Sequence, residues 1–149
     1  MIDWHRLDSV ETIGLDNLFA KETKEVFAKT NCLDCANCCK NYSPIIEEDE
    51  IPRLLKVLGV DSKTFFEDYV EMDDEGDFVF RSQPCPLLDL NSNECKIYDD
   101  RPRACRSYPH TNMKSMELHF DLLEKNIDIC PAANEIVLRV IEKIENDKA

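Results

Sequence analysis

Eight cysteines in a chain of 149 residues constrain its fold more than any other feature of the sequence. Four form one motif, Cys32-x-x-Cys35-x-x-Cys38-Cys39, and four follow separately: Cys85, Cys95, Cys105 and Cys130. Eight cysteines could form four disulfides in a small secreted protein. The N-terminus lacks the basic region and apolar segment of an export signal, and a reducing cytoplasm keeps thiols free. We therefore expect a cytoplasmic protein whose thiols bind metal, in preference to disulfides or scattered buried cysteines.

The charge balance of the chain makes several other classes of partner unfavourable. Lys and Arg number 18 against 31 Asp and Glu, so the formal net charge is −13. Such a chain repels phosphate backbones and anionic lipid surfaces. No stretch approaches the roughly eighteen consecutive apolar residues of a membrane span. We expect metal ions as partners, neither nucleic acid nor a membrane, and we leave a protein partner open.

Hydrophobic periodicity predicts an α+β fold: a small single domain over residues 1–149, mainly helical, with a short antiparallel hairpin or sheet and the cysteine cluster at its centre. A metal-binding region over residues 32–131 is expected to carry an N-terminal helix (9–30) and a C-terminal helix (131–146) packed on it. Further elements are predicted between these two helices: helices at 47–58 and from Asp61 or Ser62, a strand at 77–81, a hairpin at 85–98 and a strand at 116–122.

The spacing within the first cysteine motif points to metal coordination. Two residues between cysteines let a tight loop present both sulfurs to one ion, as in zinc knuckles and at the start of ferredoxin-type cluster motifs. Cys38 and Cys39 are adjacent, so their side chains diverge by about 100° on a helix or point to opposite faces of a strand. We therefore do not expect Cys38 and Cys39 to serve together as terminal ligands of one ion.

Eight thiols divide into two sets of four, so we predict two centres. The preferred division assigns Cys32, Cys35, Cys38 and Cys130 to one centre, and Cys39, Cys85, Cys95 and Cys105 to the other. Four thiolates around zinc, or around an oxidised [4Fe–4S] core, leave a net charge of roughly −2. Arg101, Arg103 and Arg106 lie close in sequence to Cys105 and are predicted to donate to the sulfurs, with a solvated basic patch as the alternative.

These residues resemble a known family. The similarity rests on four segments in order: the motif of residues 32–39, Pro84-Cys85-Pro86-Leu87, the segment from Cys95 through Arg101-Pro102 and Cys105-Arg106 to Pro109, and Cys130-Pro131. Together they are very similar to the CxxCxxCC family of YkgJ-like cysteine-cluster proteins. The resemblance implies a cytoplasmic domain that chelates zinc or iron. The same motif occurs in flagellin lysine methylases, where an iron–sulfur cluster is implied.

Three functions remain open at this stage: a metal-binding module with a structural, redox or regulatory role, a metal-dependent enzyme of the lysine-methylase type, and a protein that delivers or buffers metal. Whether the chain is an enzyme is left undecided. Spacing does not separate zinc from iron, and we favour iron, including a [4Fe–4S] cluster, because three cysteines in series plus a Cys-Pro pair exceed what one zinc knuckle needs. Coordination is expected to supply much of the stability of residues 32–130.

Overall fold

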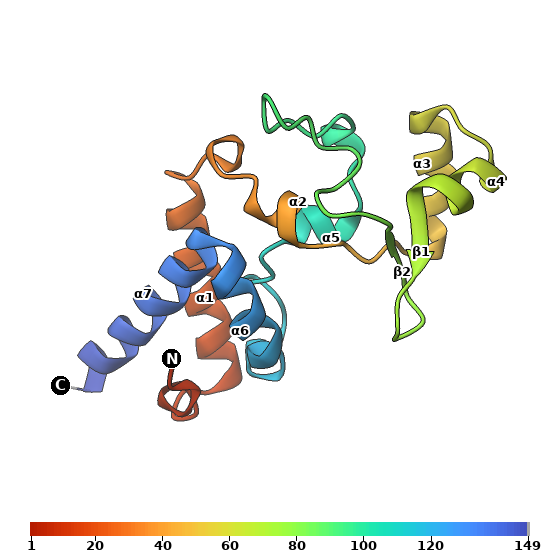
Figure 1. The fold of residues 1–149 in the computed structure, drawn as a ribbon. Coiled ribbons are helices and arrows are strands. Elements are labelled where there is room, and N and C mark those ends of the chain that lie inside the picture. The colour runs from red at the N-terminus through yellow and green to blue at the C-terminus, as the bar shows by residue number, and fades with distance from the viewer. Residues whose placement is uncertain (149) are drawn as a thin grey trace. The chain divides into compact units, whose positions relative to one another are not determined.

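The computed structural model describes residues 1–148 and divides the chain into two compact units. We call Met1–Asn31, together with the chain from Tyr108 onward, the helical unit, and Cys32–Ser107 the cysteine unit. Each unit has its own cluster of buried apolar side chains. Helices predominate, and one two-stranded antiparallel sheet is present among the described residues (Figure 1). The predicted α+β class is confirmed.

Three helices build the helical unit. α1 (Thr12–Phe27) and α6 (Phe120–Ile129) both pack on α7 (Pro131–Lys148), and short 3₁₀ helices precede α1 (Trp4–Leu7) and α6 (Met116–His119). The apolar stripe of α7 is buried, and Pro131 begins that helix, where a missing N–H costs no hydrogen bond. The structure thus confirms both the N-terminal and the C-terminal helix.

A buried carboxylate is enclosed between α1 and α7. Glu22 of α1 is inaccessible to solvent, and its two oxygens lie 2.6 Å from Arg139 Nε and 2.6 Å from Lys143 Nζ. Burial by itself would raise the pKa of Glu22, but the two cations outweigh it and hold this pKa below its usual value. The ion pairs therefore stabilise the packing of α1 on α7 only while Glu22 is ionised.

The cysteine unit consists of shorter elements. Its helices are α2 (Asn37–Asn41), α3 (Ile51–Leu58), α4 (Ser62–Thr64) and α5 (Arg103–Ser107), and α4 continues into a π-helical turn at Phe65–Tyr69. Short 3₁₀ helices occupy Cys32–Asp34, Glu48–Glu50 and Tyr98–Asp100. The strands β1 (Val70–Met72) and β2 (Phe78–Phe80) pair antiparallel, with Val70 opposite Phe80. Pro52 lies in the first turn of α3, so it does not interrupt the predicted helix.

The predicted strand at 116–122 is wrong, because this segment is helical. Met116–His119 forms a 3₁₀ helix that leads directly into α6. The carboxylate of Asp16 accepts hydrogen bonds from the backbone N–H groups of Ser115 and Met116, both at 2.8 Å, and so fixes the start of the turn. Leu118, which the alternating pattern placed on the buried face, is 76% exposed. The buried positions Met116 and Leu123 instead follow helical spacing.

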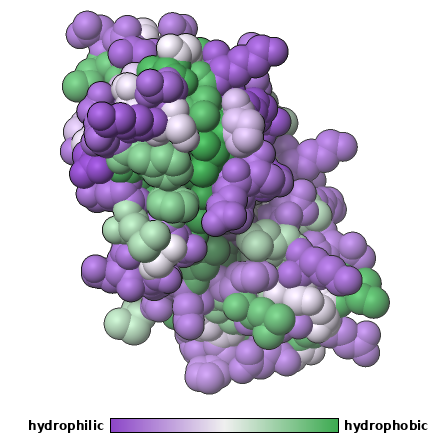
Figure 2. Space-filling view, turned by 90° about the vertical axis from the view of Figure 1, so that its right-hand side faces the viewer, coloured by the Kyte–Doolittle hydropathy of each residue, from purple (hydrophilic) through white to green (hydrophobic). Residues whose placement is uncertain are grey.

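Hydrophilic side chains cover most of the face shown in Figure 2, and hydrophobic residues form smaller patches between them. This agrees with the excess of acidic residues in the sequence. Within residues 1–148, none of the helices combines the length and the apolar character needed to cross a membrane.

Candidate metal centre

The first cysteine motif folds as two consecutive tight turns in the cysteine unit. In the first turn, the carbonyl oxygen of Cys32 accepts hydrogen bonds from the N–H groups of Cys35 (3.2 Å) and Ala36 (2.8 Å). Ala36 adopts a left-handed conformation with φ of 50°, which ends this turn and begins α2. Cys38 and Cys39 are then consecutive residues of α2. A change of backbone direction at Ala36 thus separates the two halves of the motif.

The second pair of cysteines lies on the predicted hairpin. Leu88 and Cys95 form an antiparallel bridge, and Lys96 N–H donates to the carbonyl oxygen of Leu87 at 2.8 Å. The Cys85 sulfur accepts hydrogen bonds from backbone N–H groups two and three residues later, and the Cys95 sulfur accepts one from Ile97. Backbone donation to a sulfur from the turn that follows it is typical of cysteines prepared for a metal, since it stabilises negative charge on the sulfur.

Four thiols from three separate segments gather in the cysteine unit: Cys39, Cys85, Cys95 and Cys105. Within every pair of these four thiols, charge on one thiolate raises the pKa of the other, so all four lie within electrostatic reach of one another. The backbone joins two of the segments directly, because Cys85 N–H donates to the carbonyl oxygen of Cys39 at 2.7 Å. Cys32 also lies within electrostatic reach of Cys39 and Cys35.

The thiols differ in how readily they ionise. Burial raises the pKa of Cys85 to about 11 and that of Cys105 to about 12, and neighbouring thiols raise both further. Cys39 behaves in the opposite way: a hydrogen bond from Cys38 lowers its pKa to about 7 in spite of burial, and Arg101 and Lys40 add to this effect. Cys39 is therefore the sulfur among these four that ionises most easily.

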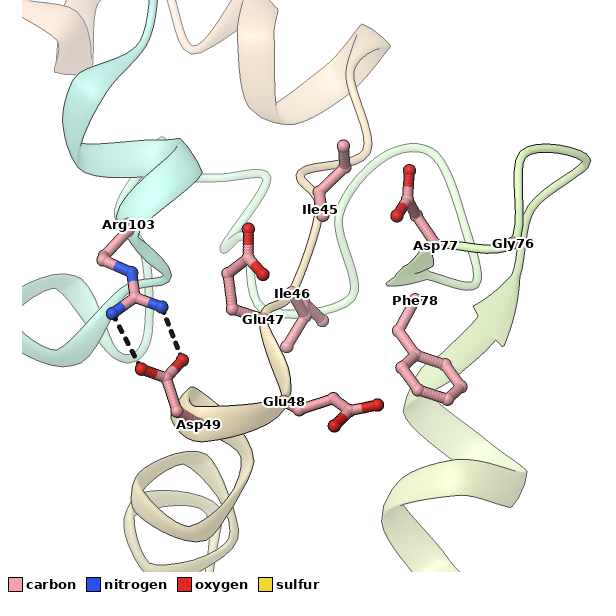
Figure 3. A pocket seen from close by; sticks show the side chains of 9 residues that line it. All are labelled: Ile45, Ile46, Glu47, Glu48, Asp49, Gly76, Asp77, Phe78 and Arg103. Carbon is pink, nitrogen blue, oxygen red and sulfur yellow. Dashed lines mark hydrogen bonds and ion pairs between the residues drawn. The ribbon is translucent and has the colours of Figure 1, made fainter.

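Of the three arginines predicted to approach the sulfurs, Arg103 is engaged with carboxylates. Its guanidinium binds both oxygens of the Asp49 carboxylate (Figure 3). Its backbone N–H donates to Glu50 Oε1 at 2.7 Å. Asp49 and Arg103 border a polar pocket of about 520 Å³, and no cysteine is among the residues that line it. Arg103 therefore ties the start of α5 to the 3₁₀ helix before α3.

The other two arginines differ from each other. Arg106 is exposed, and its Nη2 donates to the carbonyl oxygen of Asp99 at 2.7 Å. Arg101 is half-buried, and its charge acts on Cys32, Cys39, Cys95 and Cys105. Of the three arginines, only Arg101 exerts a resolved electrostatic effect on these thiols in the part of the chain that the structure describes.

Two residues beside the thiols were not anticipated from the sequence. Burial raises the pKa of Tyr42, and charges on Cys105 and Cys38 raise it further, so its hydroxyl lies near both thiols. Lys40 Nζ donates to the carbonyl oxygen of Cys35 at 3.5 Å. Helical spacing offered a signal for Tyr42, since it follows Cys38 by four residues and therefore lies on the same side of a helical turn.

Cys130 lies in the helical unit, between α6 and α7. Its N–H donates to the carbonyl oxygen of Asn126 at 2.8 Å, and its own carbonyl accepts from Asn134 N–H at 3.2 Å. The residue thus links the two helices through the backbone. Its assignment to a centre with Cys32, Cys35 and Cys38 stays a prediction.

The donor set fits a thiophilic metal in its chemistry, with clustered thiols and backbone donors to sulfur. No disulfide joins any of the cysteines within residues 1–148. Over the same residues, no group of three or more His, Cys, Asp or Glu side chains is already gathered at the spacing that holds a metal ion. An ion that binds here would therefore have to draw the sulfurs closer together.

The fold and site together define a small α+β domain with clustered cysteines. The CxxCxxCC family model, described as "Putative zinc- or iron-chelating domain", matches residues 31–131. The chain belongs to this family, as the cysteine motifs predicted. No curated protein and no solved structure matches the chain in the corresponding comparisons.

Proposed function

We propose that this chain is a thiolate-ligated metal-binding protein with two centres. The first centre would use Cys39, Cys85, Cys95 and Cys105, and the second Cys32, Cys35, Cys38 and Cys130. The observation that carries the proposal is the proximity of the first four thiols, which come from three segments of the chain. Two of these sulfurs, those of Cys85 and Cys95, accept hydrogen bonds from backbone N–H groups. Membership of a family described as zinc- or iron-chelating supports the same function.

Iron, including a [4Fe–4S] cluster, is the preferred occupant, and zinc is the alternative. Both accept four thiolates in a roughly tetrahedral arrangement. Iron would supply redox chemistry when bound, whereas zinc would supply a structural cross-link. In either case the residues of the chain contribute thiolates, N–H donors to sulfur and the closure of the segments around the ion.

The identity of the metal is tested by purifying the protein without oxygen, measuring zinc and iron per chain, and recording the visible absorption spectrum. We expect iron in stoichiometric amount with the charge-transfer absorption of thiolate-bound iron. Colourless protein with stoichiometric zinc would retain the metal-binding function and overturn the choice of iron. Protein that binds neither metal after anaerobic reconstitution would overturn the proposed function.

The division into two centres is tested by pairs of cysteine-to-serine variants. Each of Cys95→Ser and Cys105→Ser should remove one centre, and their combination should remove no more than either alone. Combining Cys105→Ser with Cys35→Ser should remove both centres, because these residues belong to different sets. If the second combination lost no more metal than the first, the proposed division would be wrong.

Metal transfer is a second candidate function, and one observation favours it. Cys32 is exposed, whereas the other seven cysteines are at least half-buried. A closed structural site leaves no ligand accessible, but an exchangeable site needs a thiolate that an acceptor can reach. Because Cys32→Ser also removes a ligand of the second centre, the measurement follows the first centre, and we expect that centre to release metal to a chromophoric chelator more slowly in Cys32→Ser than in wild-type protein. Cys35→Ser serves as the comparison, because that thiol belongs to the same set as Cys32 but is less accessible. Equal release rates in wild-type protein and Cys32→Ser would contradict transfer through Cys32.

A further inference from the structure

Arg101 is the cation of the cysteine unit whose charge is seen to act on several thiols within the described residues. Its positive charge acts on four of them: Cys32, Cys39, Cys95 and Cys105. These thiols come from three segments of the unit: the first cysteine motif, the hairpin and α5. A single guanidinium therefore lies within electrostatic reach of sulfurs from both proposed sets.

The Nε–H group of Arg101 is buried and has no hydrogen-bond partner among residues 1–148. A buried charged donor without an acceptor is costly, and native structures rarely retain one without a reason. A thiol is a weak acceptor, whereas a metal-bound thiolate carries negative charge and accepts strongly. The unmatched donor is therefore suited to sulfurs in their metal-bound, ionised form.

The surrounding residues hold this guanidinium in place. Its Cζ atom lies 3.9 Å from the ring centroid of Tyr98, which is a cation–π contact. On either side of Arg101 the backbone is anchored to α3 and its preceding turn: Arg53 donates to the carbonyl oxygen of Asp100, and Glu50, only 3% exposed, accepts from Arg103 N–H. The segment is thus pinned before any ion binds, so little ordering of Arg101 is needed afterwards.

We propose that Arg101 is a positioning residue of the first metal centre, whose Nε–H donates a hydrogen bond to a metal-bound thiolate and whose charge offsets the negative charge of the four-sulfur site. The inference rests on the proposed function and deepens it. Four thiolates around a divalent ion leave a charge of about −2, in a chain that is already strongly acidic. A donor fixed beside the sulfurs makes the ionised set less costly and strengthens metal retention.

The test uses cobalt(II) as the probe, because it enters thiolate sites and reports sulfur donation through its charge-transfer absorption. Arg101→Gln removes the charge and the Nε–H donor. Arg101→Lys keeps the charge but lacks the planar guanidinium. Arg106→Gln is the matched control, since it removes the same charge from the same segment while its guanidinium is directed at Asp99. Competition with a chromophoric chelator gives the affinity of each variant.

We expect Arg101→Gln to bind cobalt about 10–100-fold more weakly than wild-type protein, the range found for partners of metal ligands. Its charge-transfer band should move to lower energy, because the thiolate loses a hydrogen bond, while Arg106→Gln should match wild type in both measurements. Arg101→Lys should recover part of the affinity without recovering the band position. Should Arg101→Gln fail to fold, the band position in Arg101→Lys carries the test by itself.

Two outcomes would overturn the inference. One is equal affinity and band position in Arg101→Gln and Arg106→Gln. The other is full recovery of the wild-type band in Arg101→Lys, which would mean that charge alone matters. Failure of the proposed function is distinguishable from both, because then the wild-type protein itself would bind no cobalt.

Discussion

Removing the metal should unfold the cysteine unit and leave the helical unit folded. The two units are similar in length but differ in what holds them together. The longest helices of the helical unit have 16 and 18 residues, whereas the longest in the cysteine unit has eight. The segment 81–97, which carries Cys85 and Cys95, contains no helix and no strand longer than an isolated bridge among the described residues.

The cores give the size of this difference. Within residues 1–148, eleven apolar side chains of valine size or larger are buried in the helical unit and nine in the cysteine unit. Each buried apolar side chain stabilises a fold by about 1.5–3 kcal/mol. The cysteine unit has two fewer of them, so its core contributes about 3–6 kcal/mol less to the free energy of unfolding. The net stability of a domain is only about 5–15 kcal/mol, so this deficit is large. A thiolate-bound structural metal contributes about 10–16 kcal/mol and can compensate for it.

Hydrogen exchange measured by mass spectrometry separates the two units. After chelation, peptides that contain α3 and β2 should lose their protection, while peptides from α1 and α7 should keep it. Trp4 gives a second reading, because it is the only tryptophan in the sequence and stacks on Phe120 with a centroid distance of 5.1 Å within the helical unit. Its fluorescence should not change. The same chelator pre-saturated with zinc is the control.

Undiminished protection of α3 after complete metal removal would refute this reasoning. It would mean that the nine buried side chains are sufficient without coordination. Loss of protection in α1 and α7 together with α3 would also refute it, because the helical unit would then depend on the metal as well.

The helical unit supplies three further predictions. Phe19→Ala should destabilise it by about 3–5 kcal/mol in chemical denaturation followed by Trp4 fluorescence, because Phe19 is fully buried. Ile13→Ala, on the same helix but 75% exposed, should cost within about 0.5 kcal/mol, and equal effects would contradict the packing described. The depressed pKa of Glu22 means that its ion pairs stabilise the unit above the usual carboxyl range and lose that effect as the pH falls through the lowered value. The fall in the free energy of unfolding at acid pH should therefore be smaller in Glu22→Gln than in wild-type protein. The variant Glu124→Gln, at an exposed glutamate, should keep the wild-type fall. The same pH dependence in both variants would refute the assignment.

Local sequence patterns predicted much of the secondary structure correctly. Helices at both ends of the chain, the helix ending at Leu58 and the strand around Val79 all follow from periodicity and capping residues within the segments themselves. The failure at 116–122 has the same origin. Seven alternating residues resemble a strand, but the helical register becomes visible only when Leu123 and the following residues are included. The contact with Asp16, a hundred residues away, then fixes the turn.

The order and spacing of the cysteines were sufficient by themselves to indicate the family and the chemistry of its ligands, because a Cys-x-x-Cys turn is a local structure. They could not show which sulfurs are neighbours. That depends on hydrogen bonds between distant segments, such as the one from Cys85 to Cys39, and on the pairing of Leu88 with Cys95. The distinct environments of Arg101, Arg103 and Arg106 were equally hidden in the sequence. Three arginines within six residues look equivalent there. Only the fold gives them different partners: the ring of Tyr98 for Arg101, the carboxylates of Asp49 and Glu50 for Arg103, and the carbonyl oxygen of Asp99 for Arg106.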